Sequence, residues 1–317
     1  MIARDRVPGR LATVDLGTNT VRLLVVESAG GAWRPLHQIQ RVTRLGEGQA
    51  AAGRLLPEPM QRTAATVAEF ARTARGWGAE AVRIVATSAV REAVNRDEFV
   101  ARVEAESGEH VNVVSGEDEA RLTLKGVASG LPGLGPSFLL FDIGGGSTEF
   151  VLARERAPEA AVSLRLGVVP LQEEWGERGP VRWERFARMC EHLEARLGHE
   201  VPERIRTAAV HDLVGTAGTV TTLAALDLDL PSYDAARVHG HRLTRATVER
   251  LLARLGALGV DERARLPCLE PGRADVIIPG IAICLATMTC LRRDTLVVSD
   301  RGLREGILCE LLEGAGR

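Results

Sequence analysis

Residues 11–26 read LATVDLGTNTVRLLVV, and residues 138–152 read FLLFDIGGGSTEFVL. In each stretch an apolar run ends in an aspartate, Asp15 or Asp142, and a turn of small and hydroxylated residues leads into a second apolar run. This pattern predicts a strand, a tight turn and a returning strand. Because the pattern occurs twice in the same order, we interpret the two stretches as copies of one structural device.

The two turns have the composition of a phosphate site. Glycines let backbone N–H groups approach anionic oxygens closely, and a carboxylate at the strand end suits a hard cation. Two such turns facing each other would form a phosphate clamp with a magnesium ion in it. An ordinary glycine hairpin is the alternative for either copy alone, but the repetition favours function. The predicted phosphate ligands are Thr18, Asn19, Thr20, Gly144, Gly145, Gly146, Ser147 and Thr148.

Two commoner nucleotide motifs do not account for these turns. The phosphate loop of nucleotide-binding proteins needs G-x-x-x-x-G-K-[S/T] before a helix, and this string does not occur in the sequence. A dinucleotide fingerprint lies between a strand and a helix, whereas residues 144–148 lie between two runs that are typical of strands. The strand–turn–strand interpretation is therefore preferred.

The composition of the chain limits the classes of partner that it can bind. The chain has 317 residues, enough for two domains with cores, and its net charge of −2 gives no overall basic field for nucleic acid. Any anion site must therefore be local. The five cysteines are odd in number and form no C-x-x-C pair, which predicts buried thiols in a reducing cytoplasm.

No membrane segment is expected. Residues 1–10 have no apolar core typical of a signal peptide. Residues 276–291 form the most apolar stretch, but this stretch contains Pro279 and is too short to span a bilayer. It predicts a buried helix.

Strands and helices alternate in two halves of similar order, which predicts an α/β fold. The segment 131–136 (LPGLGP) breaks the chain and predicts a domain boundary. We expect one domain over residues 1–130, completed by the C-terminal segment 299–317, and a second over 131–298. Helices are predicted at 57–77, 96–106, from the Ser115 cap toward 128, and at 182–197, 216–226, 244–255, 275–291 and 301–312; further strands are predicted at 81–86, 111–114, 212–214 and 294–299.

Motifs along nearly the whole chain resemble a known family. The sequence is similar to the exopolyphosphatases and guanosine pentaphosphate phosphohydrolases, the Ppx/GppA family, within the superfamily of actin, heat-shock ATPases and sugar kinases. This resemblance implies two actin-like (ribonuclease H-like) α/β domains with a cleft between them. The matching strings are DLGTNTVR (15–22), ATSAVREAVN (86–95), SGEDEAR (115–121), DIGGGSTE (142–149), VGTAGT (214–219), GRADV (272–276) and SDRGLREG (299–306).

The resemblance also implies roles for single residues. Glu119 matches the catalytic glutamate of the family and would act as the general base for water. Asp15 and Asp142 would bind Mg²⁺ or Mn²⁺ directly or through water, or would only cap their turns by accepting N–H bonds. Glu149 would hold the water or the metal, or would be an exposed acid of the returning strand. The motif arginines Arg22 and Arg91 would bind substrate phosphate groups.

Other polar residues have simpler interpretations. Glu117 and Asp118 are expected to offset the dipole of the helix that they begin. His239 and His241 are separated by one residue, which permits chelation of a metal ion, but no third ligand is near in the sequence. We expect packing or surface roles for both histidines.

Three functions remain open at this point. They are a metal-dependent exopolyphosphatase acting on inorganic polyphosphate, a guanosine pentaphosphate phosphohydrolase, and a non-catalytic sensor of polyphosphate or nucleotide. Retention of Glu119 argues against the sensor, because binding needs no base. Larger family members carry an added helical region after these two domains, whereas this chain ends at Arg317, so we expect weaker use of long polymers. Whether the protein forms a homodimer is left open.

Overall fold

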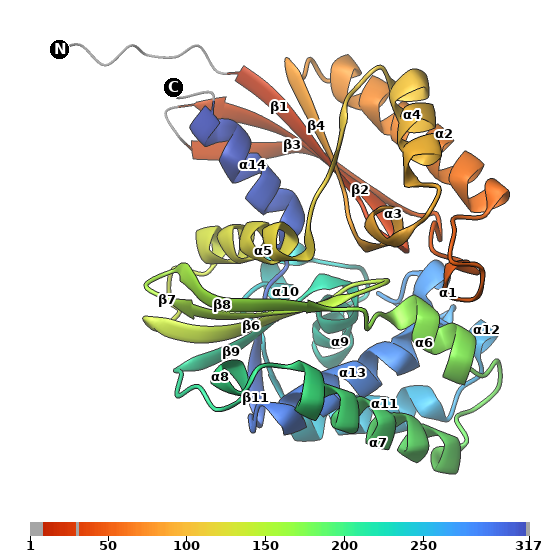
Figure 1. Cartoon of the computed structure of the whole chain (residues 1–317). Coiled ribbons are helices and arrows are strands. Elements are labelled where there is room, and N and C mark those ends of the chain that lie inside the picture. The colour runs from red at the N-terminus through yellow and green to blue at the C-terminus, as the bar shows by residue number, and fades with distance from the viewer. Residues whose placement is uncertain (1–8, 30–31, 315–317) are drawn as a thin grey trace. The chain divides into compact units, whose positions relative to one another are not determined.

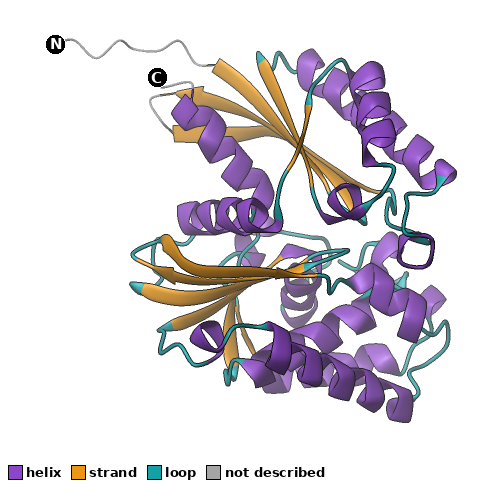
Figure 2. Cartoon of the chain, in the orientation of Figure 1, coloured by secondary structure: helices purple, strands orange, loops and turns teal. Residues whose placement is uncertain are grey.

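The computed structural model describes residues 9–29 and 32–314. The predicted end segments 1–10 and 299–317 therefore include residues outside the described ranges. The chain forms two compact units: unit 1 contains Met1–Ser115 and Leu303–Arg317, and unit 2 contains Gly116–Gly302. Each unit has its own sheet, its own helices and its own hydrophobic core (Figures 1 and 2).

The sheet of unit 1 has the strand order β3-β2-β1-β4-β5. The central strand β1 pairs antiparallel with β2 and parallel with β4, and β4 pairs parallel with β5. β3 adds an antiparallel edge strand. The strands are β1 (Gly9–Leu16), β2 (Thr20–Ala29), β3 (Ala32–Val42), β4 (Ala81–Ala86) and β5 (Val111–Val113).

Helices cover both faces of this sheet (Figure 1). Alternate residues of β1 point to opposite faces, so Val14 packs against α2 (Pro57–Gly76) and α4 (Arg96–Ser107), whereas Leu11 packs on the face of α14 (Leu303–Gly314). Burial of these apolar faces against the helices stabilises the unit. The predicted return of the C-terminal helix to the first unit is present in the structure. Two short helices, α1 (Gln49–Ala52) and α3 (Ser88–Glu92), complete the described part of unit 1.

Unit 2 repeats the plan of unit 1. Its sheet has the order β10-β11-β9-β6-β7-β8. Read from β8 to β11, it has the same strand order and the same parallel and antiparallel pairings as the sheet of unit 1. Only β10 is an addition. The strands are β6 (Ser137–Ile143), β7 (Thr148–Arg154), β8 (Ala157–Leu164), β9 (Asp212–Thr216), β10 (Arg242–Thr244) and β11 (Thr295–Val298).

The helices of unit 2 lie on both faces of its sheet. α5 (Gly116–Gly130) packs through Ala120, Leu124 and Val127 on the face that carries Phe138 and Leu140. The other face carries the larger core, which includes the almost entirely buried α13. The remaining helices are α6 (Val168–Trp175), α7 (Trp183–Glu200), α8 (Glu203–Arg206), α9 (Ala217–Asp227), α10 (Ala235–Val238), α11 (Arg245–Gly256), α12 (Val260–Arg263), η1 (Pro271–Arg273) and α13 (Ile277–Cys290).

The compact units divide at different positions from those that the sequence suggested. We expected residues 1–130 in the first domain, but α5 lies in unit 2. The reason is its apolar face, which packs on β6 and β7, whereas 131–136 is only the loop from α5 into β6. Three edge elements were also missed: β3 and β8, whose residues are largely exposed or partly exposed, and the three-residue β10.

The apolar segment 276–291 forms the buried helix α13, as predicted. In the described part of the chain, no helix is long and apolar enough to cross a membrane. All five cysteines are free, but only Cys284 is buried, which is less burial than we expected. Burial raises the pKa of Cys284 to about 12 and that of Cys190 to about 11, so neither is a reactive thiolate.

The packing of α5 leads to a test of the domain division. We propose that 116–302 folds alone, whereas 131–298 does not, because loss of α5 removes on the order of 5 kcal/mol of apolar burial. The measurement is a thermal melt and an amide NMR spectrum of each purified fragment. A cooperative melt of 131–298 equal to that of 116–302 would instead support the boundary at 131–136.

Candidate active site

The two predicted turns have the same geometry. The N–H of Gly17 donates to the carbonyl oxygen of Thr20 at 3.1 Å, and the N–H of Gly144 donates to that of Ser147 at 2.9 Å. Asp15 lies opposite Arg22 across the first hairpin, and Asp142 lies opposite Glu149 across the second. The interpretation of these stretches as two copies of one strand–turn–strand device is therefore confirmed.

In unit 2 the second hairpin directs two carboxylates toward α5. Residues directly opposite each other in an antiparallel pair point to the same face of the sheet. Asp142 and Glu149 alternate along their strands with the residues of the larger core, so they lie on the face that α5 covers. Thr123 of α5 donates its hydroxyl to Asp142 Oδ2 at 3.3 Å. Glu119 lies one helical turn before Thr123 in the first turn of α5.

Three acids therefore share one region of unit 2, in which Glu119 and Glu149 are buried and Asp142 is partly exposed. Glu149 is 2% exposed and Glu119 is 7% exposed. Burial, then the charge of Glu119 and then that of Asp142 raise the pKa of Glu149 well above its usual value. Hydrogen bonds from Ser163, at 2.7 Å, and from Ser147 oppose this rise. The surplus of negative charge makes the region attractive to a proton or a cation.

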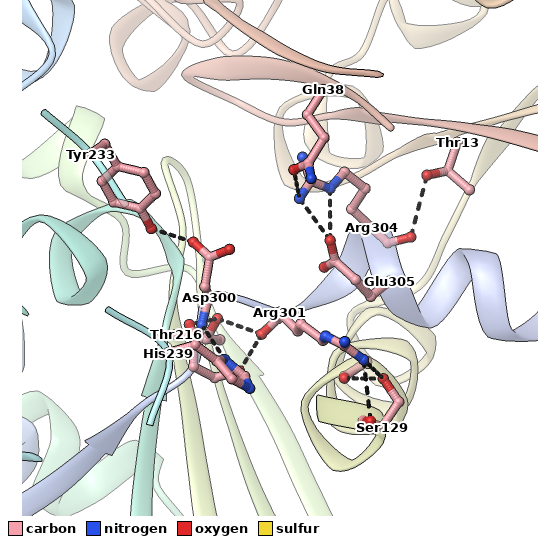
Figure 3. A network of polar contacts seen from close by, with 12 residues as sticks. Thr13, Gln38, Ser129, Thr216, Tyr233, His239, Asp300, Arg301, Arg304 and Glu305 are labelled. Carbon is pink, nitrogen blue, oxygen red and sulfur yellow. Dashed lines mark hydrogen bonds and ion pairs between the residues drawn. The ribbon is translucent and has the colours of Figure 1, made fainter. Parts of the chain in front are cut away.

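The corresponding region of unit 1 has a different charge balance. Asp15 faces α14, where Arg304 forms an ion pair with Glu305 at 2.7 Å and donates to Gln38 at 3.1 Å (Figure 3). Burial raises the pKa of Asp15, Arg22 and Arg304 lower it, and Glu305 raises it. Asp15 thus has two arginines among the causes of its pKa shift, whereas the causes of the shift of Glu149 include no arginine.

The first turn is held tightly inside unit 1. Thr18 accepts a hydrogen bond at its hydroxyl from the N–H of Ala89, and its carbonyl oxygen accepts one from Gly46. Asn19 is 8% exposed, and its Oδ1 has no hydrogen-bond partner among the described residues. Buried polar atoms nearly always have a hydrogen-bond partner. The unpaired Asn19 Oδ1 therefore indicates that a ligand, an ion or water binds at this turn.

The second turn is held by α6. The N–H groups of Val168 and Val169 donate to the carbonyl oxygens of Gly144 and Gly145 at 3.2 and 2.9 Å. A Cβ at Gly167 would lie 2.3 Å from the carbonyl oxygen of Gly145, so the close approach requires glycine. Ser147 and Thr148 are buried, whereas residues 144–146 are partly exposed. The exposed backbone of the three glycines is therefore the part of this turn that a phosphate can reach.

A third turn of unit 2 precedes α9. Ala217 has φ +69°, a strained value for a residue with a side chain. A Cβ at Gly218 would lie 1.7 Å from Nη1 of the buried Arg273, so any side chain at this position would displace that guanidinium. The Thr216 hydroxyl lies 3.0 Å from the carbonyl oxygens of Ser299 and Arg301 (Figure 3). These contacts of the Thr216 hydroxyl hold the turn in place within unit 2.

The motif arginines are placed in unit 1. Arg91 forms an ion pair with Glu92 at 3.1 Å and donates to the carbonyl oxygen of Val114 at 3.1 Å. Arg22 is partly exposed opposite Asp15. Their substrate-binding roles remain predictions. The two turns lie in different units, and the predicted clamp and cleft also remain predictions.

The histidines have structural partners. His239 Nδ1 accepts a hydrogen bond from the N–H of Asp300 at 3.1 Å, and its Nε2 lies 3.0 Å from the carbonyl oxygen of Gly130 (Figure 3). His241 contacts Asp227 instead, at 2.9 Å. The two imidazoles therefore serve separate contacts, in agreement with the packing role that we expected.

Several polar residues of the site were not singled out from the sequence. Thr123 follows Glu119 at helical spacing, which is a usable signal once the helix is accepted. Ser163 pairs with Glu149 only through the register of β7 and β8, and Arg273 meets Gly218 only in the folded unit. The partner of Ser163 depends on strand register, which no local pattern encodes, whereas Arg273 lies in the GRADV string (272–276), whose contact with Gly218 only the fold shows.

The repeated five-strand order with helices on both faces, together with paired aspartate-ended turns, defines an α/β protein of the actin-like (ribonuclease H-like) class. A model described as the Ppx/GppA phosphatase family matches residues 24–315, and the chain belongs to this family. Family membership makes it a hydrolase of the phosphatase type. The predicted fold class and family are both confirmed.

Individual relatives support this assignment. The chain is 36% identical to Exopolyphosphatase 2 of Mycobacterium tuberculosis, over 95% of this chain and 98% of that protein. It is 30% identical to the guanosine-5'-triphosphate,3'-diphosphate pyrophosphatase of Aeromonas salmonicida, over 95% of this chain but 59% of that enzyme. The crystal structure of the Ppx/GppA family member of Aquifex aeolicus superposes with a TM-score of 0.82 at 33% identity, over 98% of this chain and 100% of that one.

The buried acids of unit 2 give a pH-dependent stability. The pKa of Glu149 is raised in the folded chain, so its ionisation opposes folding increasingly as the pH rises above the unfolded value of 4.5. We predict that Glu149→Gln, in metal-free buffer, raises Tm by about 2–4 °C at pH 8 and changes it little at pH 4.5. The control is Glu117→Gln at an exposed position of the same helix, which should lower Tm slightly through the lost interaction with the helix dipole and should not raise it at pH 8. An equal effect of Glu149→Gln at both pH values would contradict this account.

Proposed function

We propose that this protein is a metal-dependent exopolyphosphatase, which releases terminal orthophosphate from inorganic polyphosphate with Glu119 as the general base. The grouping of the buried Glu119 and Glu149 with the partly buried Asp142 on one face of unit 2 carries the proposal. Grouping three acids in an apolar setting is costly unless a cation or a reaction uses them. A non-catalytic sensor has no need of this arrangement.

The comparisons favour polyphosphate over the guanosine substrate. The relative named an exopolyphosphatase is matched over 98% of its length, whereas the guanosine-nucleotide enzyme is matched over 59%. Guanosine pentaphosphate remains the alternative substrate, because cleavage of its terminal phosphoanhydride bond needs the same chemistry.

The residues present fit a divalent cation of the Mg²⁺ or Mn²⁺ type. Asp142 supplies a carboxylate beside Glu149, and the surplus negative charge of this region would be relieved by the cation. Among the described residues no group of three or more acidic, histidine or cysteine side chains is arranged to hold a metal ion. Mg²⁺ does not require such a group, since it commonly binds one or two carboxylates together with water and substrate phosphates. Asp15, with arginines as neighbours, is the weaker of the two proposed ligands.

The proposed reaction is an in-line attack of water on the terminal phosphorus. Glu119 accepts a proton as the new P–O bond forms, and the bond to the bridging oxygen breaks to leave a polymer shorter by one phosphate. A bound divalent cation would stabilise charge on the phosphate oxygens. The partly exposed backbone of Gly144, Gly145 and Gly146 would donate hydrogen bonds to those oxygens.

Two substitutions distinguish the role of Glu119 as the general base from the role of Asp142 as a metal ligand. We predict that Glu119→Gln lowers kcat by roughly 10²–10⁴-fold while leaving the Mg²⁺ requirement near the wild-type value. Asp142→Asn should instead shift half-maximal activity to a higher Mg²⁺ concentration. Phosphate release measured across a Mg²⁺ titration provides both quantities, with Glu117→Gln as the exposed control. Turnover near wild type in Glu119→Gln would exclude it as the base, and full activity after exhaustive chelation would exclude the metal.

The substrate assignment has its own test. The chain has a net charge of −2, and Arg91 and Arg304 are engaged in ion pairs, so we see no support for an extended basic track. We predict that short polyphosphates are cleaved with a kcat/KM at least equal to that of long ones, and guanosine pentaphosphate more slowly. Parallel phosphate-release assays at fixed salt decide this. A preference for the guanosine substrate would transfer the assignment to the alternative function, and a steep rise of kcat/KM with polymer length would contradict the length prediction.

The cytoplasmic location of the protein and the formation of a homodimer remain predictions.

A further inference from the structure

We propose that Thr123 is a positioning residue for the reaction, because its hydroxyl sets the orientation of the Asp142 carboxylate for the divalent cation. This inference rests on the proposed function of Asp142 as a metal ligand. Thr123 lies in α5, which covers one face of the unit 2 sheet (Figure 1). Its Oγ1 donates a hydrogen bond to Asp142 Oδ2 at 3.3 Å. Residues that orient a metal ligand without contacting the metal commonly control the metal affinity.

The Thr123 hydroxyl is directed away from its own helix. A threonine inside a helix can donate its hydroxyl to a carbonyl oxygen of the preceding turn. Thr66 in α2 and Thr221 in α9 do so, each with the residue four positions earlier, at 2.9 and 3.1 Å. Thr123 donates instead to a carboxylate oxygen of β6. The contact is therefore a tertiary one, which helix geometry does not produce by itself.

The burial of Thr123 makes an acceptor necessary. The residue is 0% exposed, so water does not reach its hydroxyl. Ala120, Leu124 and Val127 of the same helix belong to the apolar core between α5 and the sheet. A hydroxyl beside them costs free energy unless it has an acceptor. The partly exposed Asp142 supplies this acceptor.

The position of Thr123 in α5 connects the proposed metal ligand with the proposed base. Glu119 precedes Thr123 by four residues, so the two lie on the same side of the helix, about 6 Å apart along its axis. The bond to Oδ2 limits rotation of the Asp142 carboxylate. A carboxylate can accept several hydrogen bonds and bind a cation as well, so this bond is compatible with metal binding. The hydroxyl thus holds the metal ligand in one orientation relative to the base.

The test compares three variants of the intact chain. Thr123→Val removes the hydroxyl and keeps the branched shape, whereas Thr123→Ser keeps the hydroxyl. Thr66→Val makes the same change at a buried helical position outside the candidate site. Binding of Mn²⁺ is measured by the loss of the EPR signal of the free ion. We expect about tenfold weaker binding in Thr123→Val, a value within about twofold of wild type in Thr123→Ser, and no change in Thr66→Val.

Phosphate release provides a second readout. Thr123→Val should raise the Mg²⁺ concentration for half-maximal activity about tenfold, whereas its kcat at saturating Mg²⁺ should return to the wild-type value, because the bound cation then orients the carboxylate. The kcat of Glu119→Gln should not recover in this way. A double variant, Thr123→Val with Asp142→Asn, should bind Mn²⁺ as Asp142→Asn does alone, since the hydroxyl acts through that carboxylate.

Three results would overturn this inference alone. They are wild-type Mn²⁺ binding in Thr123→Val, equal weakening in Thr123→Ser, and additive losses in the double variant. If Asp142→Asn itself leaves Mn²⁺ binding unchanged, the metal ligand of the proposed function is wrong, and this inference fails with it. If Thr123→Val does not fold, Thr123→Ala takes its place with the same expected results, because it removes the hydroxyl without placing a methyl group beside the carboxylate.

Discussion

Two acidic side chains lie directly opposite each other at the turn end of a hairpin in unit 2, and the polar contacts of the candidate site form around them. Asp142 and Glu149 share a face of the sheet under α5, where Glu119 adds a third acid. Like charges in this position destabilise a sheet, and burial increases the cost. Thr123, Ser147 and Ser163 supply hydrogen bonds that offset part of it. The divalent cation that we propose would offset the rest of the cost.

The two units show how one backbone plan can hold opposite electrostatics. At the register position where unit 2 has Glu149, unit 1 has Arg22. Hairpin geometry, turn hydrogen bonds and strand order are otherwise equivalent. The residue opposite the strand-end aspartate, together with Arg304 in unit 1 and Glu119 in unit 2, therefore gives the two regions different charge balances. The helix α6 holds the glycine turn of unit 2, because the N–H groups of Val168 and Val169 donate to carbonyl oxygens of that turn.

Much of this organisation could be predicted from the sequence because it is encoded locally. The aspartate-ended turns, the helix beginning near Glu119 and the buried α13 all have short-range patterns. The position of α5 could not be predicted in this way. The break at 131–136, directly after α5, is a stronger local signal than the apolar face of the helix. Only the surface of β6 and β7 on which α5 packs shows to which unit the helix belongs. Partnerships such as that of Ser163 with Glu149 depend on strand register, and the weakly apolar edge strand β3 has no pattern of its own.

The path of the chain has a consequence for synthesis. Unit 2 is one continuous segment, whereas unit 1 is begun by the first strands and finished by α14. Leu308 of α14 packs with Leu11, Leu24 and Val26, and the Thr13 hydroxyl lies within reach of the Arg304 carbonyl oxygen. During translation the inserted unit is therefore complete before the unit that precedes it. The face of the first sheet that α14 covers therefore stays uncovered until the ribosome has synthesised α14. A chain truncated before α14 would leave that apolar face exposed to chaperones and proteases.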